Sequence, residues 1–171
     1  MTDQITVTAS PLPNPDRHII EQDEDILLAM LIWGEARSES ERGKLAVGSV
    51  VRNRVLSGKF GGDTWRNVIL KPWQFSCFNL ADPNRGKLLE PLKQDKAETW
   101  DLCYGAARSV YIGEISDETG RATHYYVAGS KVPFWANLFV FTVQIGRHLF
   151  FRDPKAFRDD YRPEPDPPLA A

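Results

Sequence analysis

The sequence predicts an α+β domain that is mainly α-helical and ends in a small antiparallel β element. Helical patterning occupies residues 23–37, 41–58 and 92–113, which cover much of the first two thirds of the chain. From residue 123 onward the apolar period changes to two, and β-branched and aromatic residues become frequent, which is typical of strands. The length of 171 residues fits a single domain around one hydrophobic core.

The first predicted helix, residues 23–37, has apolar residues on every side from Ile26 to Trp33. Three acidic residues stand in its first turn, where the helix dipole favours negative charge. A helix that is apolar all round is normally buried, so we expect this one to lie at the centre of the domain.

The remaining elements follow from periodicity and from residues that stop helices. In residues 41–58, valines recur at spacings of three and four, and Gly58 is placed to end the helix. The other predicted elements are a short helix at 64–70, a long amphipathic helix at 92–113, and short strands at 123–127 and 139–151.

Both ends of the chain have the composition of tails. Residues 1–22 form a weakly apolar stretch with several prolines, and residues 153–171 are Pro-rich without any period. We therefore expect residues 23–152 to form the folded domain, flanked by an N-terminal and a C-terminal tail.

The composition excludes several classes of partner. The formal net charge is -2 and the pI is about 5.9, which leaves no basic footprint for nucleic acid. The longest apolar run, Ile26 to Trp33, is too short to insert across a membrane. No signal-peptide core follows Met1, so we expect synthesis in a cytoplasm. The isolated Cys77 and Cys103 suggest neither a disulfide framework nor a metal site.

Glu35 ends the apolar helix and is the first candidate for chemistry. A carboxyl packed against Trp33 and the apolar end of a buried helix loses contact with water, which disfavours its charged form. Such a carboxyl keeps its proton and can act as a general acid. The alternative is a solvated glutamate at a helix end, as glutamates usually are. The helical context alone leaves both readings open.

Other polar and aromatic residues are candidates for contacts with a substrate. Glu39 shares a face with Glu35 if the helix continues, whereas a helix junction would make it a capping or positioning residue. The loop 71–79 mixes aromatic faces with amides and hydroxyls, which suits sugar rings, although such a loop can also pin its aromatics into a core. The predicted substrate-binding residues are Trp33, Glu39, Trp73, Gln74, Phe75, Ser76, His124, Tyr125 and Tyr126.

The sequence gives little support to other chemistries. His124 and His148 lack a clear third ligand, so we interpret both as structural and expect no metal and no cofactor. No serine has a G-x-S-x-G context, and no Gly-rich phosphate loop is present. A thiol nucleophile would have to pair Cys77 with His124 or His148.

Five short motifs occur in order between about residues 26 and 151 of the sequence: Gly34-Glu35-Ala36-Arg37, Ala46 to Val55, Gln74-Phe75-Ser76-Cys77, Ala122 to Tyr126, and Ile145 to Phe151. This set resembles the SleB/CwlJ-type cell wall hydrolases, which include spore cortex-lytic enzymes and small phage-encoded relatives. The departures are modest, with Ser40 where relatives often have proline and Phe151 where many have tyrosine.

The resemblance implies a lysozyme-superfamily-like domain that cuts peptidoglycan glycan strands between N-acetylmuramic acid and N-acetylglucosamine, with Glu35 as the catalytic glutamate. Because one carboxyl alone is well placed, we expect a lytic transglycosylase that leaves 1,6-anhydromuramic ends. The alternatives are a hydrolytic muramidase, a metal- or Cys-dependent peptidoglycan amidase, and a non-catalytic wall-binding virion protein.

The expected biological setting is a phage lysis enzyme, an endolysin. We expect a monomer that stays in the host cytoplasm until it is released to the periplasm and the cell wall. Its expected partners are peptidoglycan glycan strands, without nucleic acid and without membrane insertion. An enzyme carried in the virion is the alternative setting.

Overall fold

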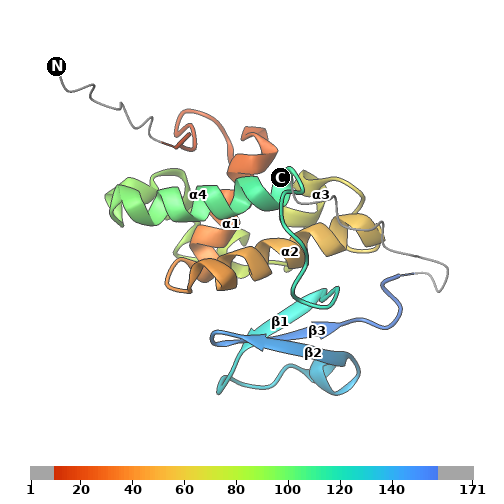
Figure 1. Ribbon diagram of the computed structural model, residues 1–171. Coiled ribbons are helices and arrows are strands. Elements are labelled where there is room, and N and C mark those ends of the chain that lie inside the picture. Colours follow the sequence, from red (N-terminus) through yellow and green to blue (C-terminus); the bar gives the residue numbers. More distant parts are fainter. Residues whose placement is uncertain (1–9, 158–171) are drawn as a thin grey trace.

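A helical body and a small sheet form the domain in the computed structural model, which describes residues 10–157 (Figure 1). The sheet lies on one side of the helical body, below α2 in Figure 1. The predicted architecture, mainly helical with a C-terminal antiparallel sheet, is confirmed. The helices are α1 (Glu24–Ala36), α2 (Glu41–Ser57), α3 (Trp65–Ile69) and α4 (Ala97–Tyr111), and the strands are β1 (His124–Val127), β2 (Val140–Ile145) and β3 (His148–Arg152).

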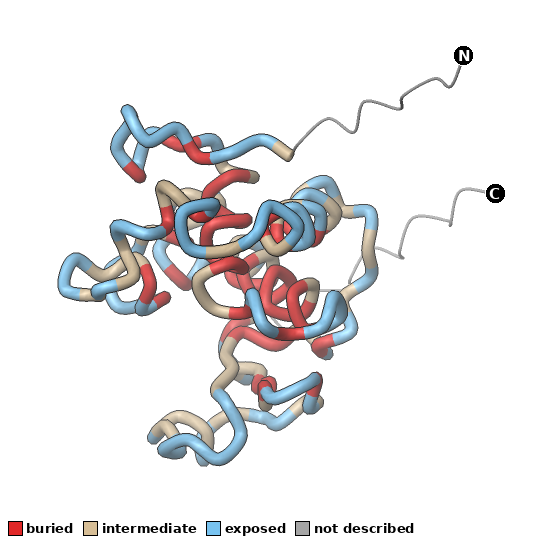
Figure 2. The backbone as a smooth tube through the Cα atoms, turned by 90° about the vertical axis from the view of Figure 1, so that its left-hand side faces the viewer, coloured by how far each residue is buried: buried red, intermediate tan, exposed pale blue. Residues whose placement is uncertain are grey.

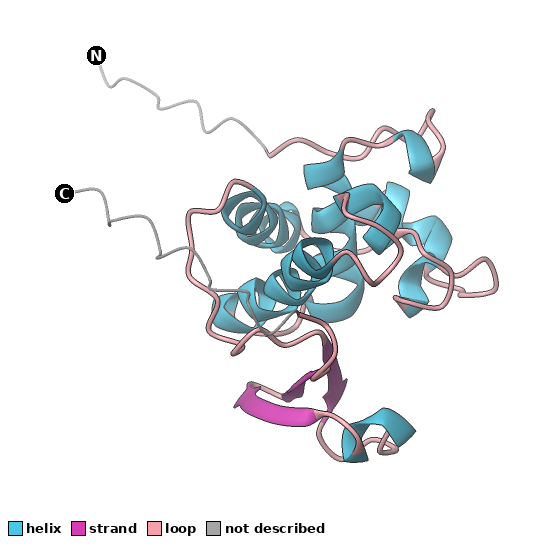
Figure 3. Cartoon of the chain, turned by 90° about the vertical axis from the view of Figure 1, so that its right-hand side faces the viewer, coloured by secondary structure: helices cyan, strands magenta, loops and turns pink. Residues whose placement is uncertain are grey.

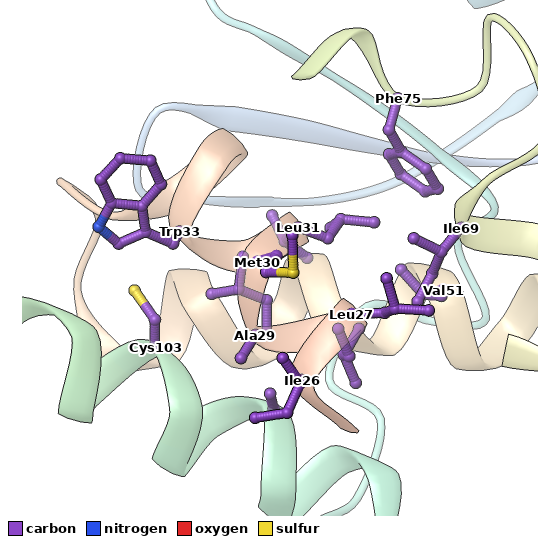
Figure 4. Close-up of a cluster of buried hydrophobic side chains, with 14 of the residues drawn as sticks. Ile26, Leu27, Ala29, Met30, Leu31, Trp33, Val51, Ile69, Phe75 and Cys103 are labelled. Atoms are coloured by element: carbon purple, nitrogen blue, oxygen red, sulfur yellow. The ribbon is translucent and has the colours of Figure 1, made fainter. Parts of the chain in front are cut away.

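Helix α1 is the centre of the core, as its composition predicts. Every residue from Ile26 to Trp33 is buried, and α2, α3 and α4 all pack against the helix. Figure 2 shows the buried residues concentrated in this helical body, and Figure 4 shows side chains of α1 meeting Val51, Ile69 and Cys103 from the surrounding helices. Each large apolar side chain buried in this way stabilises the fold by about 1.5–3 kcal/mol.

The helix ends follow local capping rules. The Ser40 hydroxyl accepts a hydrogen bond from the Gly43 N–H at 3.3 Å and caps α2. Gly58, with φ +67°, ends α2 as predicted. Helix α4 starts at Ala97, later than predicted, because Pro91–Lys93 form a 3-10 turn first. Within residues 10–157, no helix has both the length and the apolar character that crossing a membrane requires.

The sheet has the strand order β1-β3-β2, with both pairings antiparallel. Tyr125 on β1 stands opposite Phe150 on β3. The predicted strand at residues 139–151 is divided into a hairpin, because the chain turns at Gly146, whose φ of +56° a strand does not allow.

The two faces of the sheet pack differently. One face joins α2 in a small apolar cluster of Ala46, Val50, Ala122, Ile145 and Phe150. A short 3-10 helix, η5 (Phe134–Asn137), lies on the side of the sheet away from the helices (Figure 3). Its Trp135 ring meets the rings of Phe139 and Phe151 there.

The folded part extends beyond the predicted boundaries at both ends. Ile19 is buried in the main core, and the Trp100 indole N–H donates to the carbonyl of Pro11 at 2.9 Å. After β3, Ala156 is buried and the N–H of Asp153 donates to Thr123 Oγ1 at 3.0 Å. Residues 10–22 and 153–157 therefore pack on the domain, contrary to the prediction of tails. The sequence did not predict this packing, because one buried apolar side chain in an irregular segment leaves no periodic pattern. The rest of the predicted tails lies outside the described residues.

Candidate active site

An open pocket of about 440 Å³ lies where the end of α1 meets the loop before the 3-10 helix η2 (Ser76–Phe78) and the sheet. Its walls therefore come from segments far apart in sequence, joined by the packing of the sheet on the helical body. The lining residues are Glu35, Arg54, Trp73, Gln74, Phe75, Ser76, His124, Tyr125 and Trp135.

Glu35 presents its carboxylate to this pocket from the last turn of α1. The side chain is half-buried, and both of its oxygens have hydroxyl donors. The Tyr125 hydroxyl donates to Oε2 at 3.3 Å, and the Ser76 hydroxyl lies 3.5 Å from Oε1, at the outer limit of a hydrogen bond. The sequence predicted a carboxyl held by apolar surroundings, whereas the structure shows one held by two hydroxyls.

Gly34 lets the loop approach the C-terminal end of α1, next to Glu35. A Cβ at this position would lie 2.9 Å from both Cβ and Sγ of Cys77, closer than real atoms pack. Any larger residue would push the loop outward. Because Ser76 precedes Cys77 directly, this close packing also brings the Ser76 hydroxyl to Glu35.

Arg54, on α2, connects the helical body with the loop that carries Gln74 and with the segment that leads into β1. Its guanidinium donates to the carbonyl of Thr123 at 2.6 Å and to Gln74 Oε1 at 2.9 Å. It also lies between the rings of Phe60 and Phe75, at 5.3 Å and 4.9 Å from their centroids. Burial lowers the pKa of Arg54 to about 10, so the group stays cationic at neutral pH. A fixed positive charge therefore stands beside the Glu35 carboxylate.

Tyr125 carries the contact between the sheet and Glu35. Its ring meets the edge of His148 at 5.1 Å and lies 5.8 Å from Phe150, both on β3. Burial and the nearby Glu35 carboxylate raise the pKa of Tyr125 well above its ordinary value. The hydroxyl therefore stays protonated and can donate a hydrogen bond to Glu35.

The sheet side of the pocket is aromatic. The His124 ring lies 4.9 Å from Trp135 and 4.7 Å from Phe139, and burial together with Arg54 lowers the pKa of His124 to about 4. His124 is thus neutral near pH 7. Trp135 is a lining residue that the sequence analysis missed, and its only signal was the aromatic segment that follows Pro133.

Seven of the ten predicted site residues line the pocket together. Trp73 is exposed over 83% of its surface and has a φ of +67°, and its N–H donates to Asn79 Oδ1 at 3.2 Å. Gln74 and Phe75 are fixed by Arg54 as described above. The seven are Glu35, Trp73, Gln74, Phe75, Ser76, His124 and Tyr125.

The prediction that Trp33 binds substrate is wrong. Its side chain is 1% exposed and belongs to the core, close to Cys103 (Figure 4), with the Arg37 guanidinium 4.6 Å from the ring centroid. Residues two apart on an α-helix point about 200° from each other, so Trp33 and Glu35 cannot share a face.

Glu39 and Tyr126 also lie outside the lining of the pocket. The Glu39 carboxylate is buried against Arg147. Tyr126 follows Tyr125 on a strand, so it points to the opposite face of the sheet and stacks on Phe151 at 5.7 Å. The buried carboxylate of Glu39 does not support the predicted contact with a substrate. The Tyr126 ring lies 5.9 Å from the ring of the lining residue Trp135, so its contact with a substrate stays a prediction.

Glu35 is the only carboxyl among the described residues that line the pocket. Two other acidic residues considered for a second carboxylate do not line the pocket: Asp117 accepts from the Asn53 amide and from the Thr119 hydroxyl, and Glu118 forms an exposed ion pair with Arg42 at 2.5 Å. The pocket thus offers one proton-transferring carboxyl, flanked by hydroxyl donors and a buried cation.

The geometry does not favour a thiol or a metal site. Cys77 is 4% exposed, and burial together with the Glu35 carboxylate raises the pKa of its thiol far above the ordinary value. A thiolate nucleophile is therefore disfavoured. Across residues 10–157, no group of three or more His, Cys, Asp and Glu residues is arranged to hold a metal ion.

Comparison with known proteins adds an independent observation. The profile of the family described as Cell Wall Hydrolase matches residues 38–151 of the chain. The chain belongs to this cell wall hydrolase family. The matched region starts just after Glu35 and includes the pocket residues on α2, on the loop and on the sheet.

Curated relatives of this family member are spore cortex-lytic enzymes. One from Oceanobacillus iheyensis is 31% identical over 130 residues, which is 75% of this chain and 41% of the relative. One from Bacillus cereus is 30% identical over 130 residues, which is 75% of this chain and 44% of the relative. The chain thus spans less than half the length of these relatives.

Solved structures confirm the lysozyme-like fold of this family member and its SleB-type resemblance. The catalytic domain of the germination-specific lytic transglycosylase SleB from Bacillus anthracis has a TM-score of 0.59 at 26% identity, covering 76% of this chain and 95% of that domain. The catalytic domain of the Bacillus cereus SleB protein has a TM-score of 0.58 at 27% identity, covering 75% of this chain and 90% of that domain.

Proposed function

We propose that this domain is a lytic transglycosylase that cuts peptidoglycan glycan strands between N-acetylmuramic acid and N-acetylglucosamine. The observation that carries the proposal is the single carboxyl, Glu35, held by Tyr125 and Ser76 at an open pocket. Membership of the cell wall hydrolase family supports a wall substrate. The similarity to a lytic transglycosylase domain supports the reaction type.

The proposed reaction uses Glu35 twice. Protonated Glu35 gives its proton to the glycosidic oxygen as the bond to C1 of the muramic residue breaks. The positive charge at C1 is stabilised by the substrate's own N-acetyl oxygen. The carboxylate then takes the proton of the muramic 6-hydroxyl as O6 attacks C1, which forms a 1,6-anhydro ring without consuming water.

The surroundings of Glu35 fit both steps. Glycosidases that use two carboxyl groups hold them at about 5–9.5 Å, and no second carboxyl lines this pocket among the described residues. Between the two steps Glu35 carries a negative charge. The hydroxyls of Tyr125 and Ser76 and the nearby charge of Arg54 stabilise that charge.

The walls of the pocket suit a sugar strand. Trp73 and Trp135 supply aromatic faces on which the apolar faces of sugar rings stack, and Gln74 supplies an amide that Arg54 holds in place. The pocket is open rather than enclosed, which a polymer that passes through the site requires.

Product analysis in isotopic water tests the reaction. Purified peptidoglycan is digested in H₂¹⁸O, and the new muramic ends are measured by mass spectrometry. We expect anhydro ends that carry no ¹⁸O and are about 20 Da lighter than ends hydrated by H₂¹⁸O. Hydrated ends labelled with ¹⁸O would show a hydrolytic muramidase, and released peptides with intact glycans would show an amidase. The matched control is Glu35→Gln, which should release neither product.

The proposed chemistry needs no metal ion. Dialysis against a chelator should therefore leave the release of anhydro ends unchanged. Activity that disappears on dialysis and returns with zinc would refute the single-carboxyl mechanism.

We extend the proposal to the biological setting expected from the sequence, a phage endolysin that waits in the host cytoplasm as a monomer. This setting rests on the activity proposed above, because an endolysin acts by cutting the cell wall of its host. The test is expression in a Gram-negative host with and without a membrane-pore protein. Lysis that requires the pore is expected, and lysis that occurs equally without it would contradict the setting. Gel filtration at micromolar concentration checks the monomer.

A further inference from the structure

Glu39 is a buried carboxylate at the junction of α1 and α2, outside the pocket. Its side chain is only 4% exposed, yet it bonds to a residue of the β2–β3 turn. The Arg147 side chain donates from Nε to Oε1 at 2.7 Å, and the Arg147 backbone N–H donates to Oε2 at 3.3 Å. Arg147 also donates from Nη2 to the Ser38 hydroxyl at 2.9 Å. Both oxygens of the Glu39 carboxylate therefore accept hydrogen bonds from Arg147 in the β2–β3 turn.

Two glycines make room for this contact. A Cβ on Gly146 would stand 2.4 Å from Oε2 of Glu39, and a Cβ on Gly43 would stand 2.8 Å from Glu39 Cβ. The carboxylate can reach the turn only because position 146 has no side chain. On the other side, the Lys44 ammonium donates to the Glu39 carbonyl. The site around Glu39 is therefore closely fitted on the helical side and on the sheet side.

The charge of Glu39 is maintained by its partners. Burial opposes ionisation, but the hydrogen bonds from Arg147 and the charges of His148 and Arg147 more than offset it, so the pKa of Glu39 lies below its usual value. The charged form binds the turn more strongly than a neutral acid would, because hydrogen bonds to charged groups are stronger.

The turn that Glu39 holds leads directly to the Tyr125 ring. His148 follows Arg147 as the first residue of β3, and its ring makes a T-shaped contact with the Tyr125 ring, with the centroids 5.1 Å apart and the ring planes at 88°. Phe150, two residues on, is the register partner of Tyr125. A displacement of the turn would move β3, and β3 would carry Tyr125 with it.

We propose that Glu39 is a positioning residue for the reaction at Glu35. With Arg147 and Gly146 it forms a latch, and this latch holds the β2–β3 turn against the helical body so that the Tyr125 hydroxyl reaches Glu35. The role rests on the proposed function, because it concerns the turnover of Glu35.

The latch affects turnover more than folding or binding. The sheet has its own apolar cluster with α2, which includes Val50 and Phe150 and does not involve Glu39. Of the residues proposed to contact sugar, Trp73 and Gln74 stand on the helical side of the pocket and do not depend on the turn, whereas Trp135 packs on the sheet. Loss of the latch should therefore lower kcat more than it changes KM.

The first test compares two alanine substitutions in the sheet region, Gly146→Ala and Gly129→Ala. Both glycines have positive φ, +56° and +83°, so both substitutions impose backbone strain. A Cβ meets Glu39 only at position 146, and nothing lies within 4 Å of a Cβ at position 129. We expect kcat to fall roughly 10-fold or more in Gly146→Ala alone, with KM within about twofold of wild type.

The second test asks whether the latch acts through Tyr125. In a double-mutant cycle, Gly146→Ala should cost little further kcat once Tyr125→Phe has removed the hydroxyl. Arg147→Ala should resemble Gly146→Ala, and Arg147→Lys should restore part of the loss, since a lysine keeps a charged donor. The matched surface control is Arg42→Ala, which removes an ion pair whose side chains are both about 60% exposed.

Three results would overturn the latch: equal kcat in Gly146→Ala and Gly129→Ala, full additivity with Tyr125→Phe, or a change in KM alone. A readout independent of activity is amide hydrogen exchange, which Gly146→Ala should speed in β1 and β3 but not in α1. Unchanged exchange in β1 and β3 would also overturn it. A wild-type protein that cuts no glycan would refute the proposed function instead, and the exchange data would still decide whether the turn is held.

Discussion

The hydroxyl of Tyr125 lies 3.3 Å from Oε2 of Glu35, although 90 residues of sequence separate the two. Glu35 belongs to the helical body, and Tyr125 belongs to the sheet. The candidate active site is therefore complete only when the two parts of the fold are packed together.

Glu35→Gln should abolish most of the activity while the protein stays folded. The amide keeps the size of the side chain but can neither give nor take the proton, so the rate should fall by roughly 10²–10⁴-fold. The release of muramic ends measures the rate, and thermal unfolding measures the fold. Near-normal turnover with an unchanged Tm would rule out Glu35 as the acid.

Tyr125→Phe and Ser76→Ala remove the two hydroxyls that bind Glu35. A hydrogen bond to a charged group contributes about 1.5–3 kcal/mol, which corresponds to roughly 10–100-fold in rate. We expect the larger loss for Tyr125, because its contact is the shorter of the two, at 3.3 Å against 3.5 Å. Steady-state kinetics on glycan fragments checks the order, and a larger loss for Ser76→Ala would contradict it.

Arg54→Met should destabilise the domain strongly. The methionine leaves the Thr123 carbonyl and the Gln74 amide oxygen without their donor inside the protein, and we expect a loss of roughly 2–5 kcal/mol. Denaturant unfolding measures the free energy. In the control Arg42→Met, which loses only an exposed ion pair, the change should stay within about 0.5 kcal/mol.

His124 should make the fold sensitive to acid. Burial and Arg54 lower its pKa from 6.5 to about 4, so between these two pH values the unfolded chain binds more protons than the folded one. The stability contributed by neutral His124 is complete above pH 6.5 and is lost as the pH falls toward 4. His124→Gln should flatten this part of the stability curve, and the exposed His18→Gln should not. Equal slopes in all three proteins would contradict the assignment.

Cys77→Ala should keep most of the catalytic activity. The thiol is buried beside Gly34 and has no role in the proposed proton transfers, so only the packing against α1 changes. We expect a loss of about 1 kcal/mol in unfolding free energy, measured in denaturant, because a small buried group is removed. Complete loss of activity in a folded variant would revive the thiol-dependent amidase.

The sequence predicts the helical body of this fold well because its signals are local. The apolar run from Ile26 to Trp33 and the valine spacing in α2 each lie within one element, and Gly58 marks a helix end by itself. The sequence predicted one strand where the structure has the β2–β3 hairpin. The turn at Gly146 depends on one backbone dihedral within an otherwise strand-like segment.

The site is predicted less completely, because its geometry depends on long-range packing. The place of Glu35 after an apolar helix made it a candidate, and the family resemblance singled it out as the predicted catalytic residue. Its hydroxyl donors and Arg54 come from segments that periodicity cannot bring together. Trp33 was misplaced because neighbours in sequence on a helix point in different directions. Trp135 was missed because a short 3-10 helix has no pattern of its own.

The contact between Trp100 and the Pro11 carbonyl also sets where this unit can be joined to another protein. A splice made at residue 23, where the helical pattern starts, would remove the partner of a buried indole N–H and the buried Ile19 together. Exchange of the catalytic unit between wall-degrading proteins, in evolution or by engineering, should therefore preserve stability best with a splice point before Pro11. The irregular segment of residues 10–22 carries no catalytic group, but it belongs to the folded unit that must be transferred.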